Sequence, residues 1–154
     1  MRLDRAGIAS RVPHAGEMCL LDEVLEWSAQ RIRCRSDSHR RAGNPLRSGG
    51  RLGAACAVEY AAQAAALHGA LLREAGGLAG PPLAPGRLAS VRDLRLRIAR
   101  LDDAPHPLWC EVVLIAGDSK LRQYAFAVGE EHASTPWVAG RLSIVTAPAE
   151  NSTG

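Results

Sequence analysis

The sequence predicts an α+β domain in which one antiparallel sheet curls around a single long central helix. Two observations lead to this fold class. An alanine- and leucine-rich stretch, residues 52–73, has no proline and is apolar on nearly every side, as expected for a helix that is buried on most faces. Stretches of alternating side chains lie on both sides of it in the chain, and this alternation is typical of half-buried strands. A hairpin, one buried helix and several further strands favour a sheet wrapped around the helix.

The strands are expected at both ends of the chain. Residues 20–27 and 31–35 predict a hairpin, because Arg31, Arg33 and Arg35 alternate with Ile32 and Cys34. A polar, glycine-containing stretch, residues 36–50, predicts a loop. After the helix, which Gly76 and Gly77 should end, four more strands are expected, at residues 88–98, 108–116, 121–128 and 137–146.

Length and composition set the class of protein. The 154 residues suit one domain, which we place at residues 1–147, with a flexible tail at 148–154. A net charge of +3 without a recognisable binding motif argues against a nucleic-acid binder. The chain shows neither an apolar leader nor a stretch long enough to span a membrane, so a cytoplasmic protein is expected. The four cysteines have no metal-site spacing, so no metal is expected.

Two segments carry a resemblance to a known family. They read VPHAGEMCLLD over residues 12–22 and GAACAVEYAAQ over residues 53–63. Together with the order of elements, they resemble the hot-dog-fold 3-hydroxyacyl-(acyl carrier protein) dehydratases, in the branch associated with aryl polyene and polyketide-like pathways. The first segment is similar to the family's proline-histidine and aspartate pattern, and the second to the start of its central helix. The resemblance covers most of the chain and implies a hot-dog fold.

The resemblance implies a dehydratase with an acidic helix residue and a histidine. Glu59 matches the acid, which would protonate the departing hydroxyl, and we expect burial in the apolar helix to raise its pKa. In well-studied members the histidine base lies 14 residues earlier, but that position here is Pro45. His39 lies 20 residues before Glu59, and six extra residues could loop out and return it to the site. Otherwise His14 takes the role of base.

Four further residues are expected to bind the substrate. The helix start at Gly53 and Ala54 would polarise the thioester carbonyl through backbone N–H groups, and a glycine permits close approach. Gln63 lies one turn beyond Glu59 on the same helix face, where it orients Glu59, orients a backbone group or simply hydrogen-bonds in the core. Arg51 belongs to a basic stretch that suits a phosphopantetheine phosphate or acidic residues. His68, two and a half turns beyond Glu59, is expected to be a satisfied core or interface histidine.

The expected partners follow from this chemistry. The mild positive charge favours an acidic partner such as an acyl carrier protein. Because the family combines residues of two protomers in one site, we expect a homodimer or a pair with a related hot-dog subunit, and no cofactor. Two alternatives remain open at this point. One is an acyl-thioester hydrolase of the same fold, and the other is a non-catalytic hot-dog subunit of a heteromeric dehydratase.

Overall fold

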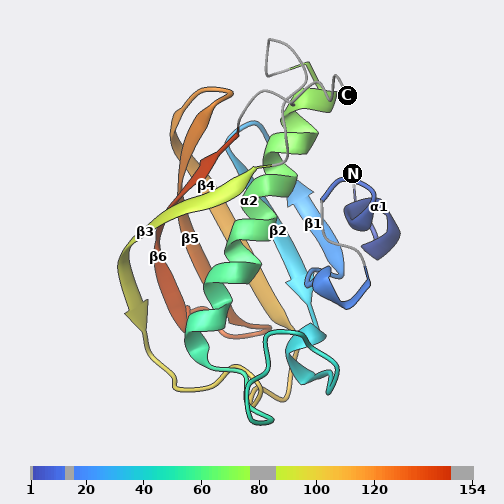
Figure 1. Ribbon diagram of the computed structural model, residues 1–154, viewed down its shortest axis with the longest axis vertical. Coiled ribbons are helices and arrows are strands. Elements are labelled where there is room, and N and C mark those ends of the chain that lie inside the picture. The colour runs from blue at the N-terminus through green and yellow to red at the C-terminus, as the bar shows by residue number, and fades with distance from the viewer. Residues whose placement is uncertain (1, 13–15, 77–85, 147–154) are drawn as a thin grey trace, which may run out of the picture.

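A six-stranded antiparallel sheet and one long helix make up most of the structure, a computed structural model that describes residues 2–12, 16–76 and 86–146 (Figure 1). The sheet order is β1-β2-β4-β5-β6-β3, so β1 and β3 are the two edge strands. The elements in chain order are α1 (Arg5–Ala9), η1 (Gly16–Met18), β1 (Glu23–Trp27), β2 (Arg31–Ser36), η2 (Ser38–Arg40), η3 (Ala54–Cys56), α2 (Ala57–Glu74), β3 (Arg87–Leu96), β4 (Leu108–Gly117), β5 (Leu121–Glu130) and β6 (Val138–Val145).

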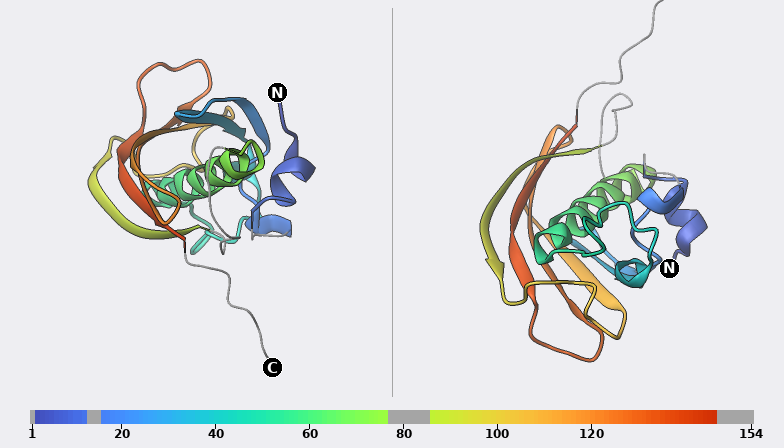
Figure 2. Two further views of the ribbon diagram at one scale, coloured as in Figure 1. Left: turned by 90° about the horizontal axis from the view of Figure 1, so that it is seen from above. Right: turned by 60° about the horizontal axis from the view of Figure 1, so that its bottom comes forward.

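The sheet curls around α2, as the sequence predicts (Figure 2). The expected hairpin is confirmed, since β1 pairs with β2 in antiparallel register from Glu23 opposite Arg35 to Trp27 opposite Ile32. The chain then passes through α2 to the far edge of the sheet, where β3 pairs with β6. The last three strands β4, β5 and β6 form a continuous meander that fills the centre. The predicted tail, residues 148–154, lies outside the described residues.

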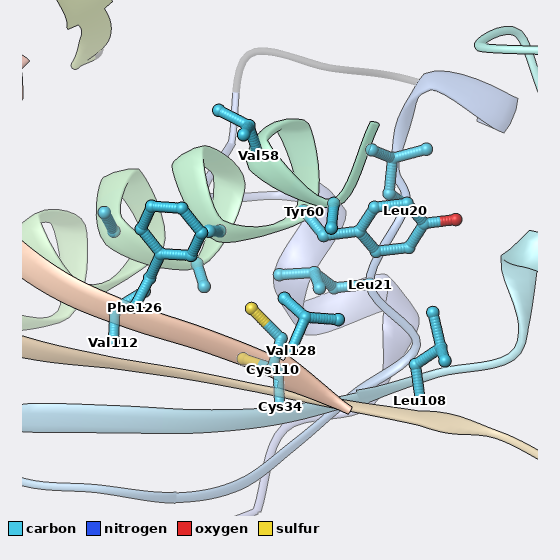
Figure 3. Close-up of a cluster of buried hydrophobic side chains, with 14 of the residues drawn as sticks. Leu20, Leu21, Cys34, Val58, Tyr60, Leu108, Cys110, Val112, Phe126 and Val128 are labelled. Atoms are coloured by element: carbon cyan, nitrogen blue, oxygen red, sulfur yellow. The ribbon is translucent and has the colours of Figure 1, made fainter. Parts of the chain in front are cut away.

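The core lies between α2 and the concave face of the sheet. Inward-facing side chains of β4 and β5, among them Val112, Phe126 and Val128, pack with Leu21 and with Tyr60 from the helix (Figure 3). The buried side of α2 includes Ala57, Ala61, Ala64 and Ala65, and these small side chains let the helix backbone approach the strands. No helix among the described residues is long and apolar enough to cross a membrane.

A second buried cluster forms near the opposite end of α2 from Glu59. His68 is fully buried; its Nε2 lies 2.8 Å from the carbonyl oxygen of Ser28 and its Nδ1 lies 2.9 Å from the hydroxyl of Tyr124. A carbonyl oxygen can only accept, so Nε2 carries the proton and Tyr124 donates to Nδ1. Arg122 then donates to the Tyr124 hydroxyl at 3.0 Å. His68 is therefore a satisfied core histidine, as the sequence predicts.

His68 should make stability depend on pH. Burial lowers the pKa of His68 from its ordinary value near 6.5, so the folded protein keeps the ring neutral where the unfolded chain begins to protonate it. The unfolded state then binds more protons, and the free energy of unfolding should fall as pH drops through about 6.5. We expect urea titrations at pH 7.5 and 5.5 to show a smaller loss for His68→Gln than for wild type. The exposed His106→Gln is the control, and an equal loss in all three proteins would contradict the prediction.

Candidate active site

His39 is a buried residue in η2, the short helix that follows β2. Its side chain is fully buried, and its Nε2 lies 3.1 Å from the carbonyl oxygen of Ala104. His39 is therefore not at the surface of its loop, because Ala104 in the 101–105 segment contacts it. Arg40, the residue after His39, also binds this segment: its guanidinium donates to the Pro105 carbonyl oxygen at 2.9 Å.

The proton on His39 can be assigned from its partner. Because the Ala104 carbonyl only accepts, Nε2 carries the proton and Nδ1 holds the free lone pair. Nδ1 is buried and makes no hydrogen bond within the described part of the chain. Burial lowers the pKa of His39, so the ring is neutral at pH 7. A neutral imidazole with an unused lone pair has the state that a general base requires.

Arg47 fixes the loop that follows His39. It donates to three backbone carbonyl oxygens, those of His39 at 3.0 Å, Arg41 at 2.8 Å and Gly50 at 2.9 Å. Its guanidinium also lies 3.5 Å from the carboxylate of Asp102, which is nearly buried. Hydrogen bonds from Arg100 hold the pKa of Asp102 well below its usual range. The carboxylate is thus a permanent charge that anchors the loop.

Residues 48–51 of this loop form a tight turn. Ser48 and Arg51 exchange both backbone hydrogen bonds, at 2.8 and 3.1 Å. Between them Gly49 and Gly50 have φ angles of 59° and 75°, the left-handed region that glycine adopts without strain. The loop therefore turns back at these glycines before it reaches the start of α2.

A buried hydroxyl network ties the His39 segment to α2. The Tyr60 hydroxyl lies 2.7 Å from Ser38 Oγ and accepts from Asn44 Nδ2 at 3.1 Å. Asn44 Nδ2 also donates to the Ser38 carbonyl oxygen at 2.9 Å, and Ser38 Oγ bonds the Leu20 carbonyl oxygen at 2.8 Å. Tyr60 is adjacent to Glu59, and Ser38 is adjacent to His39. The network therefore sets the position of one candidate catalytic segment against the other.

Glu59 lies in the first turn of α2 and is exposed in this chain. The expectation that the helix buries it is wrong, for a reason visible in the sequence pattern. The less buried stripe of α2 consists mainly of alanine, so it carries no polar signal; it runs through Glu59, Ala62, Ala66 and Ala70. Among the described residues Glu59 makes no ion pair or hydrogen bond with His39. The two candidate catalytic groups are not joined within one chain.

The start of α2 differs in part from the expectation. The N–H of Ala54 donates to the Ala99 carbonyl oxygen at 3.0 Å, so it is not free to polarise a thioester; that expectation is wrong. The reason is that the 98–101 segment pairs with the chain before the helix, as Leu101 also donates to the Leu52 carbonyl oxygen at 2.8 Å. Gly53 is exposed, with open space where a side chain would stand, which leaves room for a ligand.

Gln63 connects α2 to the segment before β1. Its side chain accepts from the Leu20 N–H at 2.9 Å and donates to the Met18 carbonyl oxygen at 2.6 Å. Of the roles considered for it, the structure shows hydrogen bonding to a buried backbone segment. His14 lies outside the described residues.

Arg51 is the one arginine of its stretch that remains without an ion pair or hydrogen bond from its side chain in the described structure. Arg40 pairs with Asp37, Arg41 with Asp22 and Arg47 with Asp102. Arg51 is exposed beside the start of α2. Within the described residues there is no cluster of three or more metal-ligating side chains.

Sequence reasoning missed the residues that hold the site together, namely Ser38, Asn44, Arg47, Tyr60 and Asp102. One signal was present, since Tyr60 is one of only two tyrosines in the chain and sits beside Glu59 in an apolar helix. A buried tyrosine hydroxyl normally has a partner. The identity of that partner depends on how the loop folds, which the sequence does not state.

Comparison with protein families gives a match over nearly the whole chain. The family described as ApeP-like, ApeP dehydratase, matches residues 6–153. The chain belongs to the ApeP-like dehydratase family. A search of curated proteins gives no match.

Solved structures agree with this assignment. The chain is similar to the dehydratase heterocomplex ApeI:P from Xenorhabdus doucetiae, with 25% identity, a TM-score of 0.77 and coverage of 95% of this chain and 92% of that chain. A candidate thioesterase from Silicibacter sp. has 13% identity, a TM-score of 0.65 and coverage of 95% and 93%. Thioesterase HI1161 from Haemophilus influenzae has 10% identity, a TM-score of 0.59 and coverage of 86% and 82%. The last two show the hot-dog fold alone.

The hydroxyl network predicts a local effect of Tyr60→Phe. Loss of the hydroxyl leaves Ser38 and Asn44 with one partner fewer, which should lower the free energy of unfolding by about 1–3 kcal/mol. Hydrogen exchange of backbone amides in residues 37–50 should become faster. Tyr124→Phe is the matched control, because it removes the other buried, hydrogen-bonded tyrosine hydroxyl far from this loop. Unchanged exchange at 37–50 in Tyr60→Phe would show that the network does not hold the loop.

Proposed function

We propose that this member of the dehydratase family converts 3-hydroxyacyl thioesters on an acyl carrier protein to trans-2-enoyl thioesters in fatty acid or polyketide-like biosynthesis. The observation that carries the proposal is His39, a buried neutral imidazole whose Nδ1 lone pair has no partner in the described chain. A buried acceptor left unpaired costs about 1–3 kcal/mol, and a base that must take a proton from a substrate is a physical reason to keep one.

The proposed reaction uses one base and one acid. Nδ1 of His39 takes the proton from C2, and the electron pair of the C2–H bond becomes the C2–C3 double bond. The C3–O bond breaks, and the leaving hydroxide takes a proton from the carboxylic acid of Glu59 to form water. The proton on His39 then returns to Glu59 through water, which restores both groups. The hydrogen bond from Nε2 to the Ala104 carbonyl oxygen favours the transient imidazolium.

The arrangement of the two groups supports a site made by two subunits. Glu59 is exposed and does not contact His39 within the chain, so a second subunit that covers the start of α2 would bring an acid to a base across the interface. We propose a homodimer or a pair with a related hot-dog subunit, in the cytoplasm and without a cofactor. Because Nδ1 of His39 is buried in the single chain, the residues around it must move when substrate binds.

A non-catalytic subunit is the second candidate. It is favoured by the similarity to a protein described as a dehydratase heterocomplex, together with the absence of a Glu59–His39 contact in the described chain. In that case a partner subunit would supply a complete acid and base pair. Gly53 and Arg51, at the exposed start of α2, would remain available to bind substrate at the shared surface.

The deciding experiment is dehydration of 3-hydroxyacyl carrier protein by the purified chain, followed by mass spectrometry. We expect enoyl product from wild type and a loss of rate of at least about 100-fold in Glu59→Gln and His39→Ala, the scale of general acid–base catalysis. His14→Ala tests the other candidate base, and Gln30→Ala, an exposed turn residue, is the control. A free thiol as product would instead show a thioesterase. If wild type forms no product from substrates of any acyl-chain length, the non-catalytic subunit is the remaining candidate.

The rate should also depend on pH in a defined direction. Protonation of His39 removes the base, and burial lowers the pKa of His39, so kcat/KM should stay high at pH 6.5 and fall only at lower pH. Initial rates measured from pH 5 to 8 would show where kcat/KM begins to fall on the acid side. A rate that already halves at or above pH 6.5 would contradict His39 as the base.

A further inference from the structure

The outer face of the sheet carries an unneutralised basic surface at the edge formed by β3 and β6. Arg92 on β3 stands directly opposite Arg141 on β6 in the antiparallel register, and Arg95 stands opposite Ala139. Residues directly opposite one another point to the same face of a sheet. Like charges in this arrangement are destabilising. We define Arg92, Arg95 and Arg141 as the outer arginine surface.

Two hollows lie against this surface. One, of about 230 Å³, is lined by Arg92, Arg141, Ile115 and Gln123 together with neighbouring residues. The other, of about 250 Å³, is lined by Arg95 and Arg141 with Ala125, Ala139 and Gly140. The small residues Ala125, Ala139 and Gly140 line the second hollow beside the longer arginine side chains. The surface is therefore both concave and basic, as a docking site for protruding acidic side chains would be.

Little within the described chain compensates this charge. The one carboxylate lining the hollows is Asp93, which lies 3.9 Å from Arg141, and the side chains of that pair are 71% and 66% exposed. Such an exposed pair contributes little. At the opposite side of the same sheet face, by contrast, Arg31 pairs with Glu26 at 2.6 Å and Arg33 pairs with Glu111 at 3.3 Å. Among the described arginines of this sheet face, those without a close carboxylate therefore lie on the β3–β6 side.

The outer arginine surface is connected to the candidate active site through the chain. Arg95 is four residues before Ala99, whose carbonyl oxygen accepts from the N–H of Ala54 at the start of α2. The end of β3 therefore leads directly to the place where Gly53 and Glu59 are exposed.

We propose that the acidic protein carrying the acyl thioester docks on the outer arginine surface, with its carboxylates on Arg92, Arg95 and Arg141. Guanidinium groups bind carboxylates in bidentate geometry, which orients the partner as well as attracting it. A second copy of this chain is a poor occupant, because its net charge is +3 and two such surfaces repel each other. This inference rests on the proposed function for the identity of the partner.

Binding can be measured apart from catalysis. Fluorescence anisotropy with labelled holo-acyl carrier proteins would give Kd for wild type, Arg92→Glu and Arg141→Glu at low and high salt. We expect each reversal to raise Kd about 10-fold or more, and salt to weaken wild-type binding. Arg31→Glu is the control, with the same change of charge on the same sheet face but outside the surface, and it should change Kd less than about twofold. Circular dichroism checks that each variant is folded.

The outcomes separate this inference from the proposed reaction. Wild-type binding that is absent, or equally weakened by all three reversals, overturns the docking surface whether or not the chain is a lyase. If the chain dehydrates substrates, KM should rise in Arg92→Glu for the carrier-borne substrate and stay unchanged for the same acyl group on pantetheine. A rise for both substrates would also overturn the proposal, because it would place Arg92 at the acyl group and not at the carrier.

Discussion

The close packing of α2 in the concavity of the sheet is the constraint on which the rest of the structure depends. The helix can approach five strands because small residues, among them Ala57, Ala61, Ala64 and Ala65, occupy part of its buried side, while leucines and Tyr60 fill the remaining space. A packed interior has few voids, so the helix has one position along the sheet. That position fixes where its first turn emerges, and therefore where Glu59, Gly53 and the loop before them lie.

Buried polar groups then define the details that apolar packing leaves open. The Tyr60 hydroxyl holds the His39 segment at one end of α2, and His68 holds the hairpin turn at Ser28 near the other. Each of these groups would be costly if left without a partner in the interior, so each contact selects one register of loop against helix. His39 Nδ1 departs from this rule, and it is this atom that the proposed chemistry uses.

The arginines of the chain fall into groups with different surroundings. Those of the 40–47 segment form ion pairs with Asp22, Asp37 and Asp102 and hold the loop in place. Arg122 is buried against Tyr124, while the outer arginine surface faces away from the helix and has little compensation. Net charge alone is small, so the electrostatic character of this protein depends on where the charges lie and not on their sum.

The sequence by itself determined the fold class, because periodicity and composition record directly which side of each element is buried. It also identified the family, through two local segments, and the satisfied state of His68, through its helical spacing from Glu59. The tertiary structure alone decided that Glu59 is exposed and His39 buried. An alanine stripe gives no polar signal, and the cover over His39 comes from a segment 65 residues later in the chain. Burial and pKa depend on contacts between residues far apart in sequence, and local patterns do not encode those contacts.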